Sequence, residues 1–208
     1  MRRLHLIRHG RTRANTEMLY CGSTDLPLLP EGREALISDR DSACYPAPGE
    51  DCVVYTSGMK RTEETLAILY GAVPHEILTG LREIDFGDFE MHSYDELKNW
   101  ESYQQWLSGD NESNCCPNGE SGQQMQKRVL ETLDALQKQG KDALVVTHGG
   151  VIAAIMARLF PKTERSRFAW QPAPGRGFTV LFEQGSAVSF QEIPVFPLPD
   201  DERESPAI

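Results

Sequence analysis

Two short blocks of this chain combine a histidine with residues that suit the chemistry of phosphate. The first is Arg8-His9-Gly10-Arg11-Thr12, which follows the apolar run that starts at Met1. An arginine offers a planar fork of N–H donors to phosphate oxygens, and a neutral imidazole is a nucleophile for phosphorus. The block therefore indicates a site that binds and attacks a phosphate group. Taken alone, it also fits a strand end with solvated charges.

The second block repeats the design of the first. The apolar run 144–146 leads into Thr147-His148-Gly149-Gly150, and another apolar stretch starts at Val151. Two histidines that each follow a buried strand and precede a glycine favour one shared site. Parallel strands deliver their last side chains to the carboxyl edge of a sheet, where open α/β sheets bind ligands. We therefore expect His9 and His148 to meet at that edge.

Strands and helices that could position these blocks alternate along the chain. We expect strands over 1–7, 51–56, 143–147, 178–183 and 187–193, a short strand within 75–81, and helices over 30–39, 61–70, 123–139, 151–160 and from Ser93 onward. This alternation predicts an α/β domain with a mostly parallel central sheet. In the helix over 61–70, we expect Leu66, Ala67 and Leu69 to face the core.

The domain organisation follows from where this alternation is interrupted. Residues 1–193 are interpreted as a single domain, with 89–121 as a helical and loop insertion over the active site and 194–208 as a surface tail. The insertion carries aromatic residues at roughly helical spacing, namely Tyr94, Trp100, Tyr103 and Trp106. They fit packing against the main domain, which we favour, or a lid that shapes a substrate pocket; the two are not exclusive.

The chain is acidic, with 208 residues and a net charge of −10. Nucleic acids and anionic membranes attract basic surfaces, so this balance argues against both as partners. An acidic protein that handles phosphate must concentrate its positive charge locally, and we expect Arg8, Arg11 and Arg61 to converge on one pocket. No stretch approaches the ~20 apolar residues of a membrane span, and no secretory signal is expected.

The cysteines point to a reducing compartment. There are 5 of them, an odd number, and they lack the spacing of a zinc site. We interpret them as reduced packing residues of a cytoplasmic protein. No constellation of metal ligands is visible in the sequence, so neither a metal nor another cofactor is expected.

The two histidine blocks resemble the hallmark blocks of the histidine phosphatase superfamily, in its phosphoglycerate-mutase-like branch. Three further stretches resemble, in the same order as in the family, an arginine-bearing turn, an acidic segment and a motif that opens a later helix; they are 57–65, 81–90 and Pro117-Asn118-Gly119-Glu120-Ser121. The resemblance spans roughly 4–155. It implies a three-layer α/β/α fold of the phosphoglycerate-mutase type.

The resemblance also implies roles for individual residues. His9 would be the nucleophile that forms a phosphohistidine, which water then hydrolyses, and two neighbouring guanidiniums would hold its imidazole neutral. Arg8, Arg61 and His148 would grip the phosphoryl oxygens, and Glu83 would be the general acid. Lesser phosphate-binding roles fall to Thr12, Asn15 and Gly149. No metal takes part in this chemistry.

The acidic segment allows a second interpretation, because Asp85, Asp88 and Glu90 lie close to Glu83 and the run also fits a solvated loop. The position of Glu83 in a Leu-x-Glu pattern favours it as the acid.

The chain also departs from common family residues at several positions that flank the pocket, namely Gly58-Met59 for Pro-Leu, Thr62 for Ala, Glu64 for Gln and Met91 for Gly. None of these changes removes a catalytic group.

The activity expected is hydrolysis of a small phosphomonoester. A cofactor-dependent phosphoglycerate mutase uses the same residues, but the mutases carry a longer insertion between the acid and the second histidine. The loop 22–28 and the compact size look most like α-ribazole-5′-phosphate phosphatases and their small broad-specificity relatives. A non-catalytic module that binds a phosphate ligand is the alternative of another class, and it would be expected to lose His9, Arg61, His148 or Glu83. The leaving group and the oligomeric state stay open.

Overall fold

A six-stranded sheet in the order β3-β2-β4-β1-β5-β6 forms the centre of the computed structural model. The structure describes residues 1–109, 112–163 and 165–196. The strands are β1 (Arg2–Arg8), β2 (Val53–Thr56), β3 (Glu76–Ile77), β4 (Ala143–Thr147), β5 (Gly177–Glu183) and β6 (Ser186–Ile193). The pairings among β1 to β4 are parallel, whereas β5 runs antiparallel to both of its neighbours. The mostly parallel α/β sheet predicted from the sequence is confirmed.

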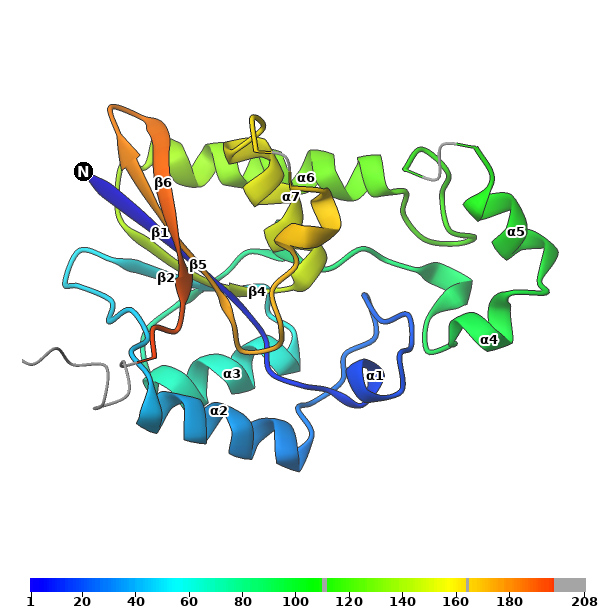
Figure 1. Ribbon diagram of the computed structural model, residues 1–208, viewed down its shortest axis with the longest axis horizontal. Coiled ribbons are helices and arrows are strands. Elements are labelled where there is room, and N and C mark those ends of the chain that lie inside the picture. Colours follow the sequence, from blue (N-terminus) through cyan, green and yellow to red (C-terminus); the bar gives the residue numbers. More distant parts are fainter. Residues whose placement is uncertain (110–111, 164, 197–208) are drawn as a thin grey trace, which may run out of the picture.

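Helices cover both faces of this sheet (Figure 1). One face packs against α2 (Pro30–Ser42) and α3 (Lys60–Tyr70), and the other against α6 (Gly122–Lys138) and α7 (Gly149–Leu159). The shorter helices are α1 (Arg13–Thr16), α4 (Tyr94–Leu97), α5 (Glu101–Leu107) and the 3₁₀ turns η1 (Thr79–Leu81), η2 (Gly87–Phe89) and η3 (Arg167–Trp170). The result is the three-layer α/β/α architecture.

The central strands are buried on both faces, as is usual for parallel strands. In β1, Leu6 belongs to the core beneath α6 and α7, whereas Ile7 belongs to the core beneath α2 and α3. In β4, Val145 and Val146 divide in the same way. This alternation fixes the register of the strands, because a shift of one residue would exchange their two faces.

A third, smaller core lies under α4 and α5, which stand apart from the sheet at one end of the molecule (Figure 1). Phe89, Leu97, Tyr103 and Cys116 are its buried residues. The predicted limits of the insertion, 89–121, include this core.

The sequence-based elements need several corrections. Helix α2 continues to Ser42, and the stretch 75–81 has only two residues of strand before the 3₁₀ turn η1. The helical segment after Ser93 consists of two short helices, and Ala67 is exposed on α3 instead of facing the core.

The last described residues of the chain pack against the main domain. Val195 pairs with Cys44 in an isolated antiparallel bridge, so the residue after Pro194 is tied to the end of α2. Most of the predicted tail, 197–208, lies outside the described residues. Within the described part of the chain, no helix has both the length and the apolar character needed to cross a membrane.

Candidate active site

A pocket of about 460 Å³ opens where β1 and β4 end. These two strands are adjacent and parallel, with Arg8 opposite Thr147, so the residues that follow them share one edge of the sheet. The rings of His9 and His148 are edge to face with centroids 5.2 Å apart. Both histidines therefore meet at the carboxyl edge, as their sequence blocks predicted.

His9 is buried in the wall of this pocket with one nitrogen committed to the backbone. Its Nδ1 lies 2.7 Å from the carbonyl oxygen of Gly10, so Nδ1 carries the proton and donates it. Burial lowers the pKa of His9 well below its usual value, and the charges of Arg61 and Arg8 lower it further. The ring is consequently neutral, with the lone pair of Nε2 available to attack phosphorus.

Arg8 brings an unused donor to the same place. Its Nη1 donates to the carbonyl of Pro172 at 2.7 Å, which orients the guanidinium. Its Nε is buried and has no hydrogen-bond partner among the described residues. A buried N–H group without a partner is costly, and an anion in the pocket would satisfy it.

Arg61 is held in position by three contacts. From the first turn of α3, Nη1 and Nη2 each donate at 2.8 Å, to the carbonyls of Thr24 and Gly22. Its Nε donates to Nδ1 of His148 at 3.3 Å. The guanidinium lines the pocket in this fixed orientation, with protons still available for a phosphate.

The loop that holds Arg61 is itself organised by Glu90. The carboxylate of Glu90 accepts from the backbone N–H groups of Gly22 and Ser23 at 2.8 and 2.9 Å, and from both the backbone and the hydroxyl of Thr24. Gly22 also passes against the backbone of Ile84, where a Cβ would lie 1.5 Å from the carbonyl oxygen. Glu90 thus acts on the pocket through Arg61, and glycine is required at 22.

His148 is fully buried and lies behind Arg61. Because Nδ1 accepts from Arg61, the proton of the neutral ring is on Nε2, which donates to Oγ of Ser57 at 2.8 Å. Burial, followed by the charges of Arg61, His9 and Arg8, lowers its pKa well below the usual value. Both nitrogens are occupied, so in this structure His148 orients Arg61 and does not itself face the pocket.

Glu83 reaches the pocket from the opposite side. Its Oε2 accepts from the N–H of Gly150 at 2.9 Å, and its Oε1 from its neighbour Ile84 at 3.1 Å. A Cβ on Gly150 would lie 2.5 Å from Oε1, so the carboxylate can approach the start of α7 only because residue 150 is glycine. Gly149, the residue predicted from the sequence, does not line the pocket, whereas Gly150 does.

The other carboxylates of the acidic segment hold loops together. Asp85 accepts from the hydroxyl of Ser23 and from the N–H of Gly87, and Asp88 accepts from the side chain of Asn118. Among the described residues of this segment, Glu83 is the acid that lines the pocket. This separates Glu83 from its neighbours by position.

The polar floor of the pocket includes Thr12 and Asn15. Asn15 Oδ1 accepts from the backbone N–H and the hydroxyl of Thr12, at 2.9 and 3.0 Å, which leaves the Asn15 amino group as a donor for a ligand. Arg11 is exposed and does not line the pocket. The prediction that Arg11 would converge with Arg8 and Arg61 is therefore wrong.

The remaining wall is largely apolar and aromatic, with Glu112 and Gln171 as polar members. Its apolar and aromatic residues are Leu19, Tyr20, Ile84, Phe86, Trp106, Leu107, Met125, Ala153 and Phe168. The hydroxyls of Tyr20 and Tyr103 are 2.6 Å apart, and Trp106 packs edge to face on Tyr20. Of the four aromatic residues at roughly helical spacing in the insertion, Tyr103 thus packs, Trp106 both packs and lines the pocket, and Tyr94 and Trp100 are exposed.

Cys21 also lines the pocket, but it is not a competing nucleophile. Burial raises the pKa of its thiol to about 11. The thiolate is the reactive form of cysteine, and at neutral pH Cys21 stays a thiol.

Sequence reasoning missed the residues that position the others. The sequence shows Ser57 and Glu120 only as members of motifs, and nothing in it marks Tyr20 or Arg128. Glu120 precedes α6 and Arg128 lies 8 residues further on, a longer spacing than the pairs three or four apart that meet on a helix surface, so no local pattern marks this ion pair.

Comparison with known proteins decides the family. The histidine phosphatase superfamily (branch 1) matches residues 4–187. The chain belongs to this superfamily. Its phosphatases hydrolyse phosphate monoesters through a phosphohistidine and without a metal ion, and this chain is one of them.

Similar proteins within the superfamily include both phosphatases and a mutase. An adenosylcobalamin/α-ribazole phosphatase of Salmonella typhimurium is 34% identical over 165 residues, covering 76% of this chain and 79% of the relative. The α-ribazole phosphatase structure from Shigella flexneri has a TM-score of 0.77 at 27% identity, covering 93% and 95% of the two chains. The phosphoglycerate mutase structure from Thermus thermophilus has a TM-score of 0.66 at 26% identity, covering 90% and 97%.

Proposed function

We propose that this chain hydrolyses the 5′-phosphate of a ribonucleoside with an aromatic base, α-ribazole 5′-phosphate, through a phosphohistidine at His9. The observation that carries the proposal is the neutral His9 beside Arg8 and Arg61, in a pocket whose other wall is aromatic. The volume of about 460 Å³ falls in the range of small-molecule sites and exceeds what a phosphate group fills. The relatives named for α-ribazole support this choice of leaving group.

The first step transfers the phosphoryl group to the enzyme. The lone pair on Nε2 of His9 forms a bond to phosphorus while the bond from phosphorus to the ester oxygen breaks. The proton of Glu83 passes to that oxygen, which leaves as a neutral alcohol. Arg8 and Arg61 stabilise the negative charge on the oxygens that do not react, with Thr12 and Asn15 as additional donors.

The second step returns the enzyme to its starting state. Glu83, now a carboxylate, accepts a proton from water as the water oxygen bonds to phosphorus. The bond from phosphorus to Nε2 breaks, and inorganic phosphate leaves. His148 serves both steps by keeping Arg61 in place. A contact of Gly149, the first residue of α7, with the bound phosphate stays a prediction.

Mutase activity is the alternative, and it requires the phosphohistidine to be protected from water. Glu83 is partly exposed and lines the open pocket, which gives water a route to the intermediate. This favours hydrolysis over transfer back to a sugar acid.

The test is a panel of phosphomonoesters that includes α-ribazole 5′-phosphate, other ribonucleoside 5′-phosphates and 3-phosphoglycerate. The intact protein should release phosphate fastest from the aromatic ribonucleoside, and His9→Ala should release none above background. Isomerisation of 3-phosphoglycerate with little free phosphate would establish the mutase instead. Stabilisation of the protein by phosphate or vanadate without turnover of any ester would support the binding module.

The wider setting is part of the same proposal. The cysteines of the described chain are free, which fits a cytoplasmic enzyme. A small phosphomonoester is its proposed partner, and the net charge of −10 disfavours nucleic acid. We keep residues 1–193 as one catalytic domain. Fractionation of cells and light scattering of the purified protein test the compartment and the oligomeric state.

A further inference from the structure

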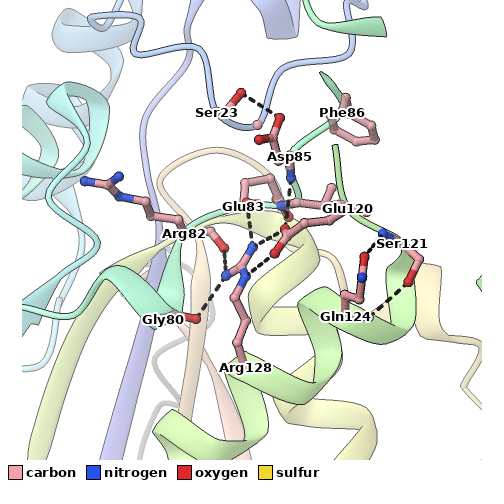
Figure 2. A network of polar contacts seen from close by, with 12 residues as sticks. Ser23, Gly80, Arg82, Glu83, Asp85, Phe86, Glu120, Ser121, Gln124 and Arg128 are labelled. Carbon is pink, nitrogen blue, oxygen red and sulfur yellow. Dashed lines mark hydrogen bonds and ion pairs between the residues drawn. The ribbon is translucent and has the colours of Figure 1, made fainter. Parts of the chain in front are cut away.

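Arg128 on α6 uses its entire guanidinium within the protein (Figure 2). The five N–H donors of an arginine are matched by five hydrogen bonds. Two go to the carboxylate of Glu120, at 2.8 and 2.7 Å. The other three go to the carbonyl oxygens of Gly80, Arg82 and Glu83, at 3.0, 2.6 and 2.8 Å. Among the described residues, no other side chain binds as many main-chain carbonyls in and next to the acidic segment.

We propose that Arg128 and Glu120 are a positioning pair for Glu83, the general acid of the proposed function on which this inference rests. Glu83 is held from two directions. Its carbonyl oxygen is bound by Arg128, and its carboxylate is bound by the N–H groups of Gly150 and Ile84. The side chain between these fixed ends is consequently aimed at the pocket.

The partner Glu120 extends the same support in two ways. It forms a two-point ion pair with Arg128, which sets the plane of the guanidinium. Its Oε2 also accepts from the backbone N–H of Asp85, so the pair binds the chain on both sides of Ile84. Both side chains are 25% exposed, so the pair is partly screened by solvent, and its effect lies in geometry more than in long-range charge.

The local backbone needs such support because it has little of its own. Residues 82–86 lie between η1 and η2, outside any helix or strand. Carbonyl oxygens that converge without a donor would be costly, and Arg128 supplies the donors. Because an error of about 1 Å in a catalytic group can cost ~100-fold in rate, holding this stretch matters for proton transfer.

Substrates with different leaving groups can distinguish a purely structural role of Arg128 and Glu120 from a role in positioning Glu83. An alkoxide needs a proton in the transition state, whereas p-nitrophenolate leaves without one. The ratio of kcat/KM for a ribonucleoside 5′-phosphate to that for p-nitrophenyl phosphate therefore reports on the general acid. Because kcat/KM covers the steps up to formation of the phosphohistidine, the later attack by water does not enter.

The experiment compares Arg128→Lys and Glu120→Gln with Glu83→Gln as the reference for loss of the acid. Arg40→Lys is the matched control, because Arg40 also binds a carboxylate and a main-chain carbonyl, those of Asp41 and Ile68, but lines no part of the pocket. We expect Arg128→Lys to lower kcat/KM about 10- to 100-fold for the nucleotide and only ~2-fold for p-nitrophenyl phosphate. Glu120→Gln should shift the ratio in the same direction by less, and Arg40→Lys should leave it unchanged.

Two results would overturn the inference in distinguishable ways. If Glu83→Gln changes the ratio and the folded Arg128→Lys and Glu120→Gln proteins do not, the positioning pair is wrong and the proposed function stands. If Glu83→Gln itself lowers kcat/KM equally for both substrates, Glu83 is not the acid, and both proposals lose that residue. Thermal melting of each variant identifies any that does not fold, and the variant that does fold decides the question.

Discussion

His9 and His148 each precede a glycine at the end of an apolar strand but occupy different environments. Each follows the last residue of a parallel strand, and the two strands are neighbours in the sheet. His9 binds one carbonyl within its own block and leaves Nε2 for the pocket. His148 binds Ser57, which follows β2, and Arg61 on α3, and has no nitrogen left.

A strand-end histidine therefore acquires its role from the neighbouring strand, which for His148 is β2. Residues after β2 lie on the side of His148, because β2 pairs with β4 and not with β1. Ser57 and Arg61 can therefore reach His148 with hydrogen bonds. The order of strands in the sheet leaves Nε2 of His9 free for the proposed attack and makes His148 a support for the neighbouring Arg61.

The largest effect should separate the two histidines. We expect His9→Ala to lose kcat by about 10⁴-fold or more, because the phosphohistidine no longer forms. His148→Ala should lose ~100- to 1,000-fold, the usual cost of weakening one oxyanion donor, here Arg61. Steady-state kinetics with a ribonucleoside 5′-phosphate measures both. Equal losses would contradict the assignment of different roles.

A change next to the second histidine should act on the acid instead. In Gly150→Ala, the new methyl group would meet the Glu83 carboxylate at 2.5 Å and displace it from the start of α7. We expect kcat/KM for the nucleotide to fall ~100-fold. Gly49→Ala provides the control, because a Cβ there would meet nothing within 4 Å. A Gly150→Ala protein with unchanged leaving-group dependence would show that Glu83 tolerates the displacement.

A smaller effect is expected when only the support of His148 is removed. Ser57→Ala deletes the acceptor for Nε2–H and leaves a buried donor unpaired, which costs about 1–3 kcal/mol of stability. Turnover should fall ~10-fold, because Arg61 loses part of its orientation but none of its contacts to the loop. Urea unfolding and kinetics measure the two effects. A loss of turnover as large as that of His9→Ala would mean that Ser57 itself takes part in the reaction.

The smallest difference should appear in the pH dependence of stability. Both histidines have a pKa well below 6.5 in the folded protein, whereas unfolded histidine binds a proton near that value. Below about pH 6.5 the unfolded state therefore binds more protons than the folded state. As the pH is lowered from there, the free energy of unfolding decreases until the pH reaches the folded-state pKa values. His9→Asn and His148→Asn should each flatten this slope. The measurement is the urea midpoint of the wild-type protein and of both variants between pH 7.5 and 5. A slope in the variants equal to that of the wild-type protein would contradict the assignment of both buried histidines as neutral.

Local patterns in the sequence were enough to predict the mostly parallel sheet and the meeting of both histidines at its carboxyl edge. An apolar run followed by His-Gly is a short-range signal, and the alternation of strands and helices fixes the class of fold. Even one departure from the family is understandable from the backbone, since Met91 has φ 62°, a conformation that favours the glycine common at that position.

Long-range contacts could not be predicted in this way. Arg61 is oriented by carbonyls of Thr24 and Gly22, which are 37 and 39 residues away. Arg11 belongs to the same block as His9, but the turn into α1 leaves its side chain in solvent. Arg128 shows no motif, because its targets are backbone carbonyls, which every residue carries.

The most direct test of the account is to trap the phosphorylated enzyme. The protein is mixed with substrate, quenched in alkaline denaturant, in which phosphohistidine survives, digested and examined by mass spectrometry. If His9 is the nucleophile, a phosphoryl group will be found on the peptide that contains His9, absent from His9→Ala and still formed, more slowly, in His148→Ala. A phosphoryl group on His148, or turnover of the substrate with neither histidine phosphorylated, would contradict that role.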